Sequence, residues 1–449
     1  MPKDLRSFLS DAEDASELLR VKREVRPRFQ ASAILARLEA EGKYPAVLFE
    51  RVRGHRYPVL SNAFASLRRL SMALEVEEKD LLKGYIGLIN RPRKPKEAPE
   101  APVKERVLVG KKADLRELPI LTHHEKDGGP YITGGVAVVR DPEEGFINCG
   151  IYRMMLKGGR KLGIQFANTS HAYYILRRSE ELGRPLPVAV VVGHHPAFYI
   201  GAVAMNPIGV DEYSQIGGFL REPLAVTQGT AVDLPIPAYA EIVIEGEIPP
   251  NVREKEGPLG EYSGIYGPCY NEPIINIKAI NIRRDAIYHD IFVGHPDNLL
   301  LGMTARLNII YQTVKTACPS VKDIHMPLAG RCRFICYIAL QKRVEGEAKN
   351  ALMAAFAADP FLKYAVAVDP DVDIRDDTQV LHAIATRTRA GEDIFMVSNA
   401  KGSQLDPTAV DGRVPKVGID ATRRKGAYEE IRVPGVAEIR LEDFIDGDR

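Results

Sequence analysis

The feature that most constrains the fold is a series of short β-branched segments between residues 107 and 298. They are rich in Val and Ile, and Gly or Pro separates one from the next, which predicts β-strands. We expect these strands at 132–141, 147–156, 161–167, 186–193, 240–248 and 275–285. Helical stretches at 170–183 and 211–222 interrupt the series. So many strands with turn residues between them favour a barrel or a strongly curved sheet.

The regions on either side of these strands have a different pattern. Before them we predict a helix over 7–25, a strand over 44–52, a helix over 62–76, and a Pro-rich, charged linker or surface loop over 91–106. After them we predict one long helix over 298–318 and then strand and helix in alternation, at 334–341, 346–359, 364–374 and 377–389. That alternation is typical of an α/β domain.

The chain of 449 residues is long enough for several domains. The fold class that we predict is mixed α/β, in four parts. These are an N-terminal α/β region over 1–106, a strand-rich domain over 107–298, a linker helix over 299–318 and a C-terminal α/β domain over 319–449.

The composition argues against several classes of protein. Lys plus Arg number 61 and Asp plus Glu number 60, so the basic excess of a nucleic-acid-binding protein is missing and no such partner is expected. The five Cys are irregularly spaced, which favours reduced thiols in the cytoplasm over a structural zinc site. We expect neither a secretory signal nor a membrane span. The many charges and the absence of Trp resemble the composition of thermophile proteins.

Three polar residues of the strand-rich region form a candidate metal site. Asn148, His171 and Glu212 would supply an amide oxygen, an imidazole and a carboxylate. Such a mixed oxygen and nitrogen set suits Mn²⁺ or Mg²⁺, with water or phosphate in the remaining positions. The alternative is that Asn148 ends a loop, His171 opens a helix and Glu212 is a solvated acid. A nucleotide enzyme is disfavoured, because the usual phosphate-binding glycine loops are missing.

The stretch EGPLGEYSG places two acids, Glu256 and Glu261, around a turn made of Gly and Pro. Arg153 lies in an apolar strand segment, where a cation needs an anion. If Arg153 lies between the two acids, the nearer acid stays charged, and the other, once desolvated, has a raised pKa and can deliver a proton. The alternative is a structural ion pair and one exposed Glu.

These pieces, in this order, resemble the UbiD family of decarboxylases. The resemblance spans nearly the whole chain, and its most specific motifs are N-x-x-x-x-R at 148–153 and E-G-P-x-G-E at 256–261. It implies a central split β-barrel that binds a flavin, a long linker helix and a C-terminal oligomerisation domain. It also implies prenylated FMN as the cofactor, made by a UbiX-type flavin prenyltransferase, and a homodimer or homohexamer.

Site residues carried over from the family match particular positions of this chain. Asn148, His171 and Glu212 match ligands of a divalent ion, usually Mn²⁺, that also holds the cofactor phosphate. The segment from Ala202 to Met205 matches the lining of a nearby K⁺ site. The positions expected to contact the cofactor are Thr133, Asn148, Ile151, Ser170, His171, Ala202, Met205 and Glu212, with Lys363 and Lys416 as further candidate phosphate partners.

The resemblance also assigns the catalytic work. Arg153 would orient the substrate carboxylate, Glu256 would hold Arg153, and Glu261 would protonate the carbon left by CO₂ after a covalent adduct with the cofactor. The substrate would be a small unsaturated or aromatic acid. One candidate is trans-anhydromevalonate 5-phosphate, giving isopentenyl phosphate in a modified mevalonate pathway of isoprenoid biosynthesis; another is an acid of the hydroxybenzoate type. His295 and Arg306 are expected near the substrate, where their side chains would allow an additional anion to bind.

Two functions from other classes stay open on the residues alone. A flavin-independent metal hydrolase would use Asn148, His171 and Glu212 directly. A non-catalytic assembly protein would need none of these side chains.

Overall fold

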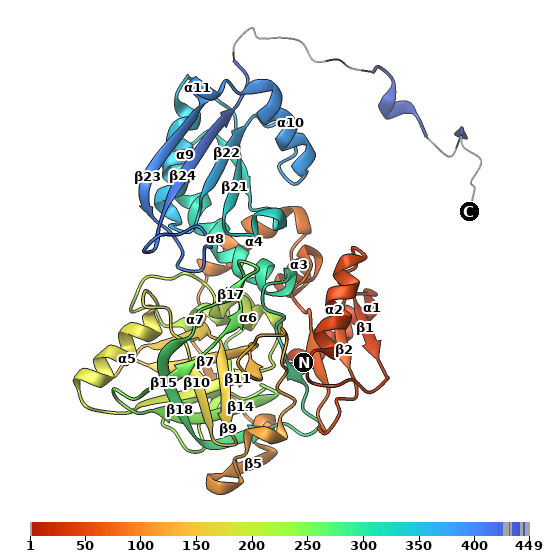
Figure 1. Ribbon diagram of the computed structural model, residues 1–449. Coiled ribbons are helices and arrows are strands. Elements are labelled where there is room, and N and C mark those ends of the chain that lie inside the picture. Colours follow the sequence, from red (N-terminus) through yellow and green to blue (C-terminus); the bar gives the residue numbers. More distant parts are fainter. Residues whose placement is uncertain (1, 425–430, 432, 441–442, 445–449) are drawn as a thin grey trace.

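The computed structural model describes residues 2–424, 431, 433–440 and 443–444. The parts of the predicted C-terminal domain at 425–430, 432, 441–442 and 445–449 lie outside the described residues. Within these limits the chain has the predicted mixed α/β architecture. Figure 1 shows the N-terminal elements in red beside a large central sheet, and a second sheet in blue at the opposite end of the molecule from β5 (Arg106–Val109).

The central sheet confirms the expectation of a large, curved β-structure. All its strand pairs are antiparallel, and the order is β6-β9-β10-β18-β14-β11-β7-β8, with β5 and β15 also paired to β18. Its other strands are β6 (Tyr131–Ile132), β7 (Gly135–Arg140), β8 (Ile147–Ile151), β9 (Met154–Gly158), β10 (Lys161–Ile164), β11 (Leu186–Val192), β14 (Ile242–Ile248), β15 (Arg253–Glu256) and β18 (Tyr270–Ile282).

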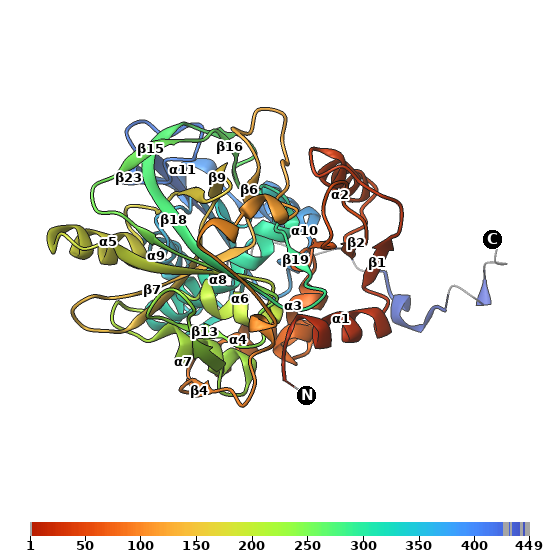
Figure 2. The same cartoon turned by 90° about the horizontal axis from the view of Figure 1, so that it is seen from below.

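Both faces of this sheet are covered, because alternate residues of each strand point to opposite sides. On one face, Val136, Val138 and Val191 share a core with α6 (Pro196–Ala202), α7 (Glu212–Leu220) and α8 (Pro296–Ala317). On the other face, the alternate residues of the same strands share a core with α5 (His171–Glu181) and α2 (Gln30–Ala40). In Figure 2, α5 lies to the left of the central strands and α2 lies to their right.

The N-terminal region corrects one sequence-based prediction. The helix expected over 7–25 is wrong in extent, because α1 covers Leu5–Asp14 and β1 follows at Leu18–Val21. Ser16 has a φ of 60°, and β1 then pairs in parallel with β2 (Ala46–Phe49). Strand pairing outweighs the helical pattern of these residues. The remaining elements are β3 (Val59–Ser61), α3 (Leu67–Leu74), α4 (Leu81–Ile89) and β19 (Tyr288–His289), which completes the sheet order β1-β2-β3-β19.

The C-terminal region is a five-stranded sheet in the order β20-β21-β22-β24-β23. Its elements are β20 (Val321–His325), β21 (Ile335–Leu340), α9 (Glu347–Ala358), β22 (Tyr364–Val368), α10 (Asp377–Arg387), α11 (Ala390–Asp393), β23 (Ile394–Lys401) and β24 (Arg413–Ala421). The long helix predicted over 298–318 is α8, which packs on α9 and β20. It lies between the two large sheets (Figure 1).

Two small sheets complete the described structure. One has the order β13-β12-β4 and is built from β4 (Lys96–Glu97), β12 (Ala225–Gln228) and β13 (Pro235–Pro237). The other is a hairpin of β16 (Leu259–Gly260) and β17 (Tyr266–Gly267). This hairpin carries the EGPLGEYSG stretch to the end of the central sheet that faces the C-terminal region.

Candidate active site

Strand β8 is the terminal strand of the central sheet, and α5, α6 and α7 all pack against it. Asn148 lies opposite Val139 in the β7–β8 register, so its side chain shares the face of the sheet that α5 covers. Glu212 is the first residue of α7, whose N-cap is Asp211. Asn148 and Glu212 are both 3% exposed, so two polar side chains meet in a nearly dry position.

The contacts of this pair leave one hydrogen-bond acceptor free. Asn148 Nδ2 donates to Glu212 Oε2 at 3.0 Å, and the backbone N–H of Cys149 donates to the same oxygen. Asn148 Oδ1 is buried and accepts no hydrogen bond from the residues that the structure describes. Burial raises the pKa of Glu212 to about 8, against the hydrogen bond from Cys149, and Asp211 adds to the rise. The site therefore presents an amide oxygen and a carboxylate, both of which are suited to bind a cation.

His171 begins the helix next to this pair. Ser170 is the N-cap of α5 and accepts the N–H of Tyr173 at 3.2 Å, which fixes where the helix starts. Burial lowers the pKa of His171 and so favours the neutral imidazole, the form that binds metal ions. Tyr152 links α5 to Glu212, because its hydroxyl interacts with both Ser170 and Glu212. Burial raises the pKa of this hydroxyl and the charge of Glu212 adds to the rise, while the hydrogen bond with Ser170 opposes it.

The donor set fits a hard divalent cation. Within the described part of the chain, no group of three or more His, Cys, Asp or Glu side chains is arranged to hold a metal. The amide oxygen of Asn148 is therefore needed to complete a set of three ligands with His171 and Glu212. The free Oδ1 atom and the raised pKa of Glu212 fit a site whose carboxylate is stabilised by a nearby cation. Mn²⁺ or Mg²⁺ accepts this combination of oxygen and nitrogen ligands.

A second polar cluster begins two residues after β8 ends. Arg153 Nη2 contacts Glu256 Oε2 at 2.6 Å, and Arg153 Nη1 contacts Glu261 Oε1. Glu256 is fully buried, and Arg153 and Glu261 are each 8% exposed. One guanidinium thus bridges two carboxylates in the arrangement that the sequence suggested, because the strand predicted over 147–156 breaks between Ile151 and Met154.

The glycines around this cluster are required by close contacts. A Cβ on Gly257, whose φ is 102°, would lie 2.9 Å from the carbonyl oxygen of Pro268 and 3.4 Å from Arg153 Nη2. A Cβ on Gly260 would lie 2.4 Å from the ring of His124, and one on Gly267 would lie 3.1 Å from Arg153 Nη1. Only glycine lets the backbone approach the ion cluster this closely.

The two acids of the cluster differ in what surrounds them. Burial raises the pKa of Glu261, against the attraction of Arg153, and the negative charge of Glu256 adds to the rise. For Arg153, burial favours loss of the proton, but the two carboxylates outweigh it and raise the pKa. Arg153 therefore stays charged, and Glu261 is a carboxyl group that keeps its proton to a higher pH than an exposed Glu.

Thr133 belongs to a buried network that the sequence did not predict. Its hydroxyl donates to Asp290 Oδ1 at 3.0 Å, and Asp290 also contacts His123 Nε2 at 3.0 Å and the hydroxyl of Ser61 at 2.9 Å. Burial would raise the pKa of Asp290, but His123 and the hydroxyl donors lower it. The adjacent His pair at 123–124 and the acid after His289 were the only sequence signals for this network.

Other predicted contact positions differ in their accessibility. Ile151, the last residue of β8, is half-buried. Ala202 is buried at the end of α6, and Met205 just beyond it is 43% exposed. The segment 202–205 therefore runs from the core to the surface.

The two lysines expected near a phosphate contact the chain itself. Lys363 Nζ lies 2.8 Å from Asp406 Oδ2 and donates to Thr408 Oγ1 at 2.8 Å. Lys416 Nζ donates to the carbonyl oxygens of Pro360 and Leu362, at 3.0 and 2.7 Å. Both ammonium groups thus have acceptors within the C-terminal region.

His295 and Arg306, expected to leave room for an extra anion, also have carboxylate partners. His295 Nδ1 contacts Glu39, and Arg306 Nη1 contacts Asp359 at 2.7 Å.

The C-terminal region contacts the loop between β16 and β17, which contains Glu261. The hydroxyl of Tyr262 and that of Ser403, in the segment 401–407, share a hydrogen bond. Arg331 donates to the carbonyl oxygens of Tyr262 and Gly294, at 2.9 and 2.7 Å. The polar segment 401–407 therefore packs against the turn that carries the candidate acid.

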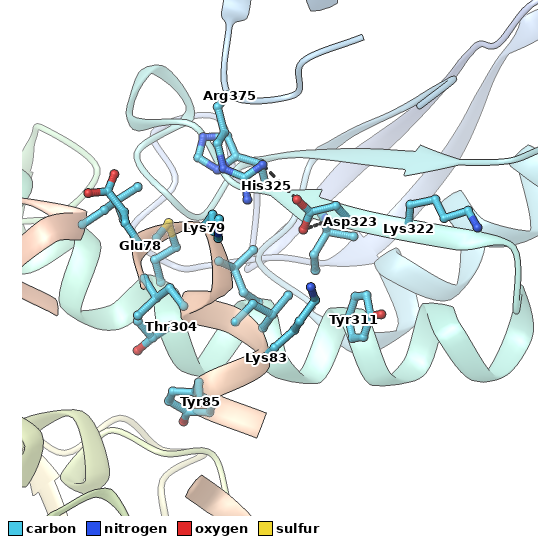
Figure 3. A pocket seen from close by; sticks show the side chains of 16 residues that line it. Glu78, Lys79, Lys83, Tyr85, Thr304, Tyr311, Lys322, Asp323, His325 and Arg375 are labelled. Atoms are coloured by element: carbon cyan, nitrogen blue, oxygen red, sulfur yellow. Dashed lines mark hydrogen bonds and ion pairs between the residues drawn. The ribbon is translucent and has the colours of Figure 1, made fainter. Parts of the chain in front are cut away.

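A well-formed cavity of about 140 Å³ lies elsewhere, among α4, α8 and β20. Figure 3 shows Lys83 and Tyr85 of α4, Thr304 and Tyr311 of α8, and His325 of β20 around it. None of the predicted site residues lines this cavity. Among the described helices, none combines the length and the apolar character needed to cross a membrane.

Three family profiles match consecutive parts of the chain. They are the N-terminal domain, the Rift-related domain and the C-terminal domain of 3-octaprenyl-4-hydroxybenzoate carboxy-lyase, UbiD, at residues 9–89, 94–296 and 298–421.

Two curated relatives have the same name. The anhydromevalonate phosphate decarboxylase of Methanothermobacter thermautotrophicus is 34% identical over 95% of this chain and 99% of its own length. That of Methanosarcina mazei is 35% identical over 96% of this chain and 99% of its own length.

Solved structures of UbiD-class enzymes are also similar to this chain. The UbiD-class enzyme HmfF from Pelotomaculum thermopropionicum, in complex with FMN, superposes with a TM-score of 0.94 at 38% identity, over 98% of this chain and 100% of that one. An evolved dimeric form of HmfF in complex with prFMN gives 0.91 at 35% identity, over 99% and 100%. The 3,4-dihydroxybenzoic acid decarboxylase of Klebsiella pneumoniae gives 0.88 at 26% identity, over 99% and 100%. The chain therefore belongs to the UbiD family of carboxy-lyases, and it is a decarboxylase.

Proposed function

We propose that this enzyme uses prenylated FMN to decarboxylate trans-anhydromevalonate 5-phosphate, giving isopentenyl phosphate. The observation that carries the proposal is the buried bridge of Arg153 between Glu256 and Glu261. We infer the substrate from the name of two relatives, which match almost the whole chain at 34 and 35% identity. The cofactor follows the FMN and prFMN bound by the HmfF structures.

The ion cluster would perform the protein's part of the chemistry. Arg153, whose charge is secured by two carboxylates, attracts the carboxylate of the substrate. Glu256 is fully buried and holds one side of the guanidinium, so that Arg153 keeps its orientation. Glu261 is the group with the raised pKa and is the proton donor.

The reaction replaces the carboxylate on the α-carbon with a proton. The bond between the α-carbon and the carboxylate breaks, CO₂ leaves, and the electron pair stays on the α-carbon side. The bound flavin supplies the electron sink for this pair. A proton from Glu261 then forms the new C–H bond, and solvent restores the proton on Glu261.

The cofactor would be held at the other cluster. We place Mn²⁺ or Mg²⁺ on Asn148, His171 and Glu212, where the free amide oxygen and the raised pKa of Glu212 support a cation. The metal would bind the phosphate of the flavin, with K⁺ nearby at the segment 202–205. Thr133, Ile151 and Ser170 are the proposed flavin contacts. Lys363 and Lys416 are left out of this set because both have acceptors of their own.

The assembly and the domain division are part of the same proposal. A UbiX-type prenyltransferase would supply the cofactor, and the enzyme would act as a homodimer or homohexamer. The long helix at 299–318 would link the flavin domain, 107–298, to a C-terminal domain that makes the oligomer contacts.

An aromatic acid is the second candidate substrate. It is favoured by the similarity to 3,4-dihydroxybenzoic acid decarboxylase, which has a TM-score of 0.88 over 99% of this chain. The two candidates differ in the substrate only, so they share the cofactor and the ion cluster.

The test is co-expression with a UbiX-type prenyltransferase, followed by incubation with a panel of acids and measurement of released CO₂. The panel contains trans-anhydromevalonate 5-phosphate, the corresponding free alcohol, and hydroxybenzoic acids. We expect a yellow protein that contains Mn and turns over the phosphorylated acid fastest. Turnover of the aromatic acids alone would favour the second candidate. Hydrolytic activity that needs the metal but no flavin would instead support a metal hydrolase.

A further inference from the structure

Arg333 is a buried cation that lacks an anion. It lies between the turn at 328–330 and β21, and it is 8% exposed. Its Nε and Nη1 atoms are buried and make no hydrogen bond, and Arg333 forms no ion pair with the described residues. Arg69, a buried arginine that is 1% exposed, instead contacts Glu17 at 2.5 Å. A buried charge without a partner is unfavourable, so the isolated position of Arg333 needs an explanation.

The surroundings of Arg333 are shaped to hold its guanidinium. Gly302 lies within α8, and a Cβ there would be 2.6 Å from Arg333 Nη2. Glycine inside a helix is destabilising, and here it makes room for the cation. The Cζ atom of Arg333 lies 4.7 Å from the ring centroid of Tyr262, a cation–π contact. The backbone just before it is strained, because Arg331 and Cys332 both have positive φ, 58° and 51°.

The carboxylates nearest to Arg333 are engaged with other arginines. Asp359 contacts Arg306 Nη1 at 2.7 Å, and Glu261 contacts Arg153. Arg306 lies one helical turn from Gly302, on the same side of α8. Burial and the positive charge of Arg306 lower the pKa of Arg333 to about 10, so it remains a cation at neutral pH. Arg333 therefore stays charged, with open donors, beside the residue that follows the candidate acid.

Arg333 lies close to Glu261. Tyr262, which Arg333 contacts, is the next residue after Glu261, and the positive charge of Arg333 lowers the pKa of Glu261. If the carboxylate of a small acid meets Arg153, we place the other end of that acid on the Arg333 side of Glu261. An anion at that end would supply the missing partner.

We propose that Arg333 binds a second anionic group of the substrate, a phosphate monoester, and thereby selects a phosphorylated unsaturated acid over the same acid with a free hydroxyl group. The inference rests on the proposed function and adds to it a residue that binds the end of the substrate far from its carboxylate. A guanidinium with free donors is well suited to phosphate, because its planar N–H groups match two phosphate oxygens.

The test compares two substrates in the cofactor-loaded enzyme, trans-anhydromevalonate 5-phosphate and its free alcohol. For the Arg333→Met variant we expect kcat/KM for the phosphorylated acid to fall by roughly 100-fold, the usual scale for charge-assisted hydrogen bonds. For the alcohol we expect a change of less than about threefold, because it has no second charge to lose. Arg333→Lys keeps the charge without the planar donors, and its preference should be intermediate.

The matched control is Arg331→Met. Arg331 is two residues away, but its guanidinium already donates to two backbone carbonyls. We expect this variant to lower the melting temperature and to leave the ratio of kcat/KM for the two substrates unchanged.

A separate binding measurement does not depend on turnover. Isopentenyl phosphate and isopentenyl alcohol are titrated into the FMN-loaded wild-type and Arg333→Met proteins by calorimetry. We expect the phosphate to bind at least about tenfold more tightly to the wild type and to lose this advantage in the variant.

The outcomes distinguish the two proposals. An equal fall for both substrates in Arg333→Met, or an unchanged substrate ratio in both Arg333 variants, would overturn the role of Arg333. Wild-type holoenzyme that releases no CO₂ from any acid would instead overturn the proposed function. In that case, loss of phosphate binding in Arg333→Met would still support the anion site.

Discussion

Two buried polar clusters lie five residues apart along the chain, at Asn148 and at Arg153, and they differ in their charge balance. The cluster at Arg153 is complete, because one guanidinium bridges two carboxylates of the same chain. The cluster at Asn148 is incomplete, because a carboxylate and an amide meet there and one acceptor stays free. The first is preformed by the polypeptide, and for the second we propose that a cation completes the cluster.

The difference follows from what each cluster must do. A group that orients a substrate and donates a proton needs fixed neighbours, and ion pairs within the chain supply them. A group that binds a metal must present unpaired oxygens or nitrogens. Arg333 extends the comparison to a third site, where the chain provides the cation and leaves the anion to the ligand.

The largest expected effect is on turnover, from Glu261→Gln. This variant keeps the size of the side chain and an acceptor for Arg153 but removes the acidic proton. We expect decarboxylation to fall by about 10²–10⁴-fold while the flavin absorbance is retained. The control is Glu254→Gln in β15, a half-buried acid that pairs with Lys161 at 2.7 Å, for which we expect little change. Full activity in Glu261→Gln would remove Glu261 from the role of acid.

The next effect is on stability, from Arg153→Met. Loss of the guanidinium leaves Glu256 buried without a cation, which should cost about 3–5 kcal/mol of unfolding free energy. The double variant Arg153→Met/Glu256→Gln removes the stranded charge as well and should recover part of that loss. Urea denaturation of both variants measures the difference. If the double variant is as unstable as the single one, the loss of stability does not come from the unpaired charge of Glu256.

The cluster at Asn148 should respond to metal instead. Saturating Mn²⁺ with FMN should stabilise the wild type by about 2.7 kcal/mol at a ligand concentration 100 times Kd, and a chelator should reverse this. His171→Ala should lose the metal and most of the stabilisation. His382→Ala, the same change at an exposed position of α10, should keep both. Equal metal content in His171→Ala and the wild type would remove His171 from the ligand set.

The smallest effect is on the pH dependence. Because the pKa of Glu261 is raised in the folded protein, its proton is held more tightly there than in the unfolded chain, whose value is near 4.5. Its stabilising contribution is full below the unfolded pKa and is lost as the pH rises through the folded pKa. We expect the stability of the wild type to fall relative to Glu261→Gln across that interval, and kcat to fall over the same rise in pH. Parallel stability curves would contradict the raised pKa.

Some of these features could be predicted from the sequence because they are local. The E-G-P-x-G-E turn brings Glu256 and Glu261 together through neighbouring backbone, and a cation in an apolar strand segment indicates that acids lie nearby. The helix at 298–318, the C-terminal alternation of strand and helix and the curved central sheet were predicted for the same reason, since periodicity and turn residues are read over short windows.

Other features could not be predicted because they depend on distant partners. The helix expected over 7–25 stops at Asp14, since Leu18–Val21 pair with a strand about 28 residues further on. Lys363 lies next to β22 and Lys416 lies in β24, but only the folded chain shows that Asp406 and two carbonyl oxygens contact them. The network of His123, Thr133 and Asp290 likewise joins residues 157 or more positions apart.

The strand-rich core, the order of the elements and the two motifs around Arg153 and Asn148 can be recognised in the sequence alone, because hydrophobic period and turn chemistry are properties of neighbouring residues. Which charges are balanced depends instead on the folded chain. Glu256 and Glu261 both reach Arg153, while Arg333 packs against Gly302 and Tyr262 and finds no carboxylate among the described residues. Burial and pairing depend on what the fold brings within a few ångströms, and that is decided by residues far apart in the chain.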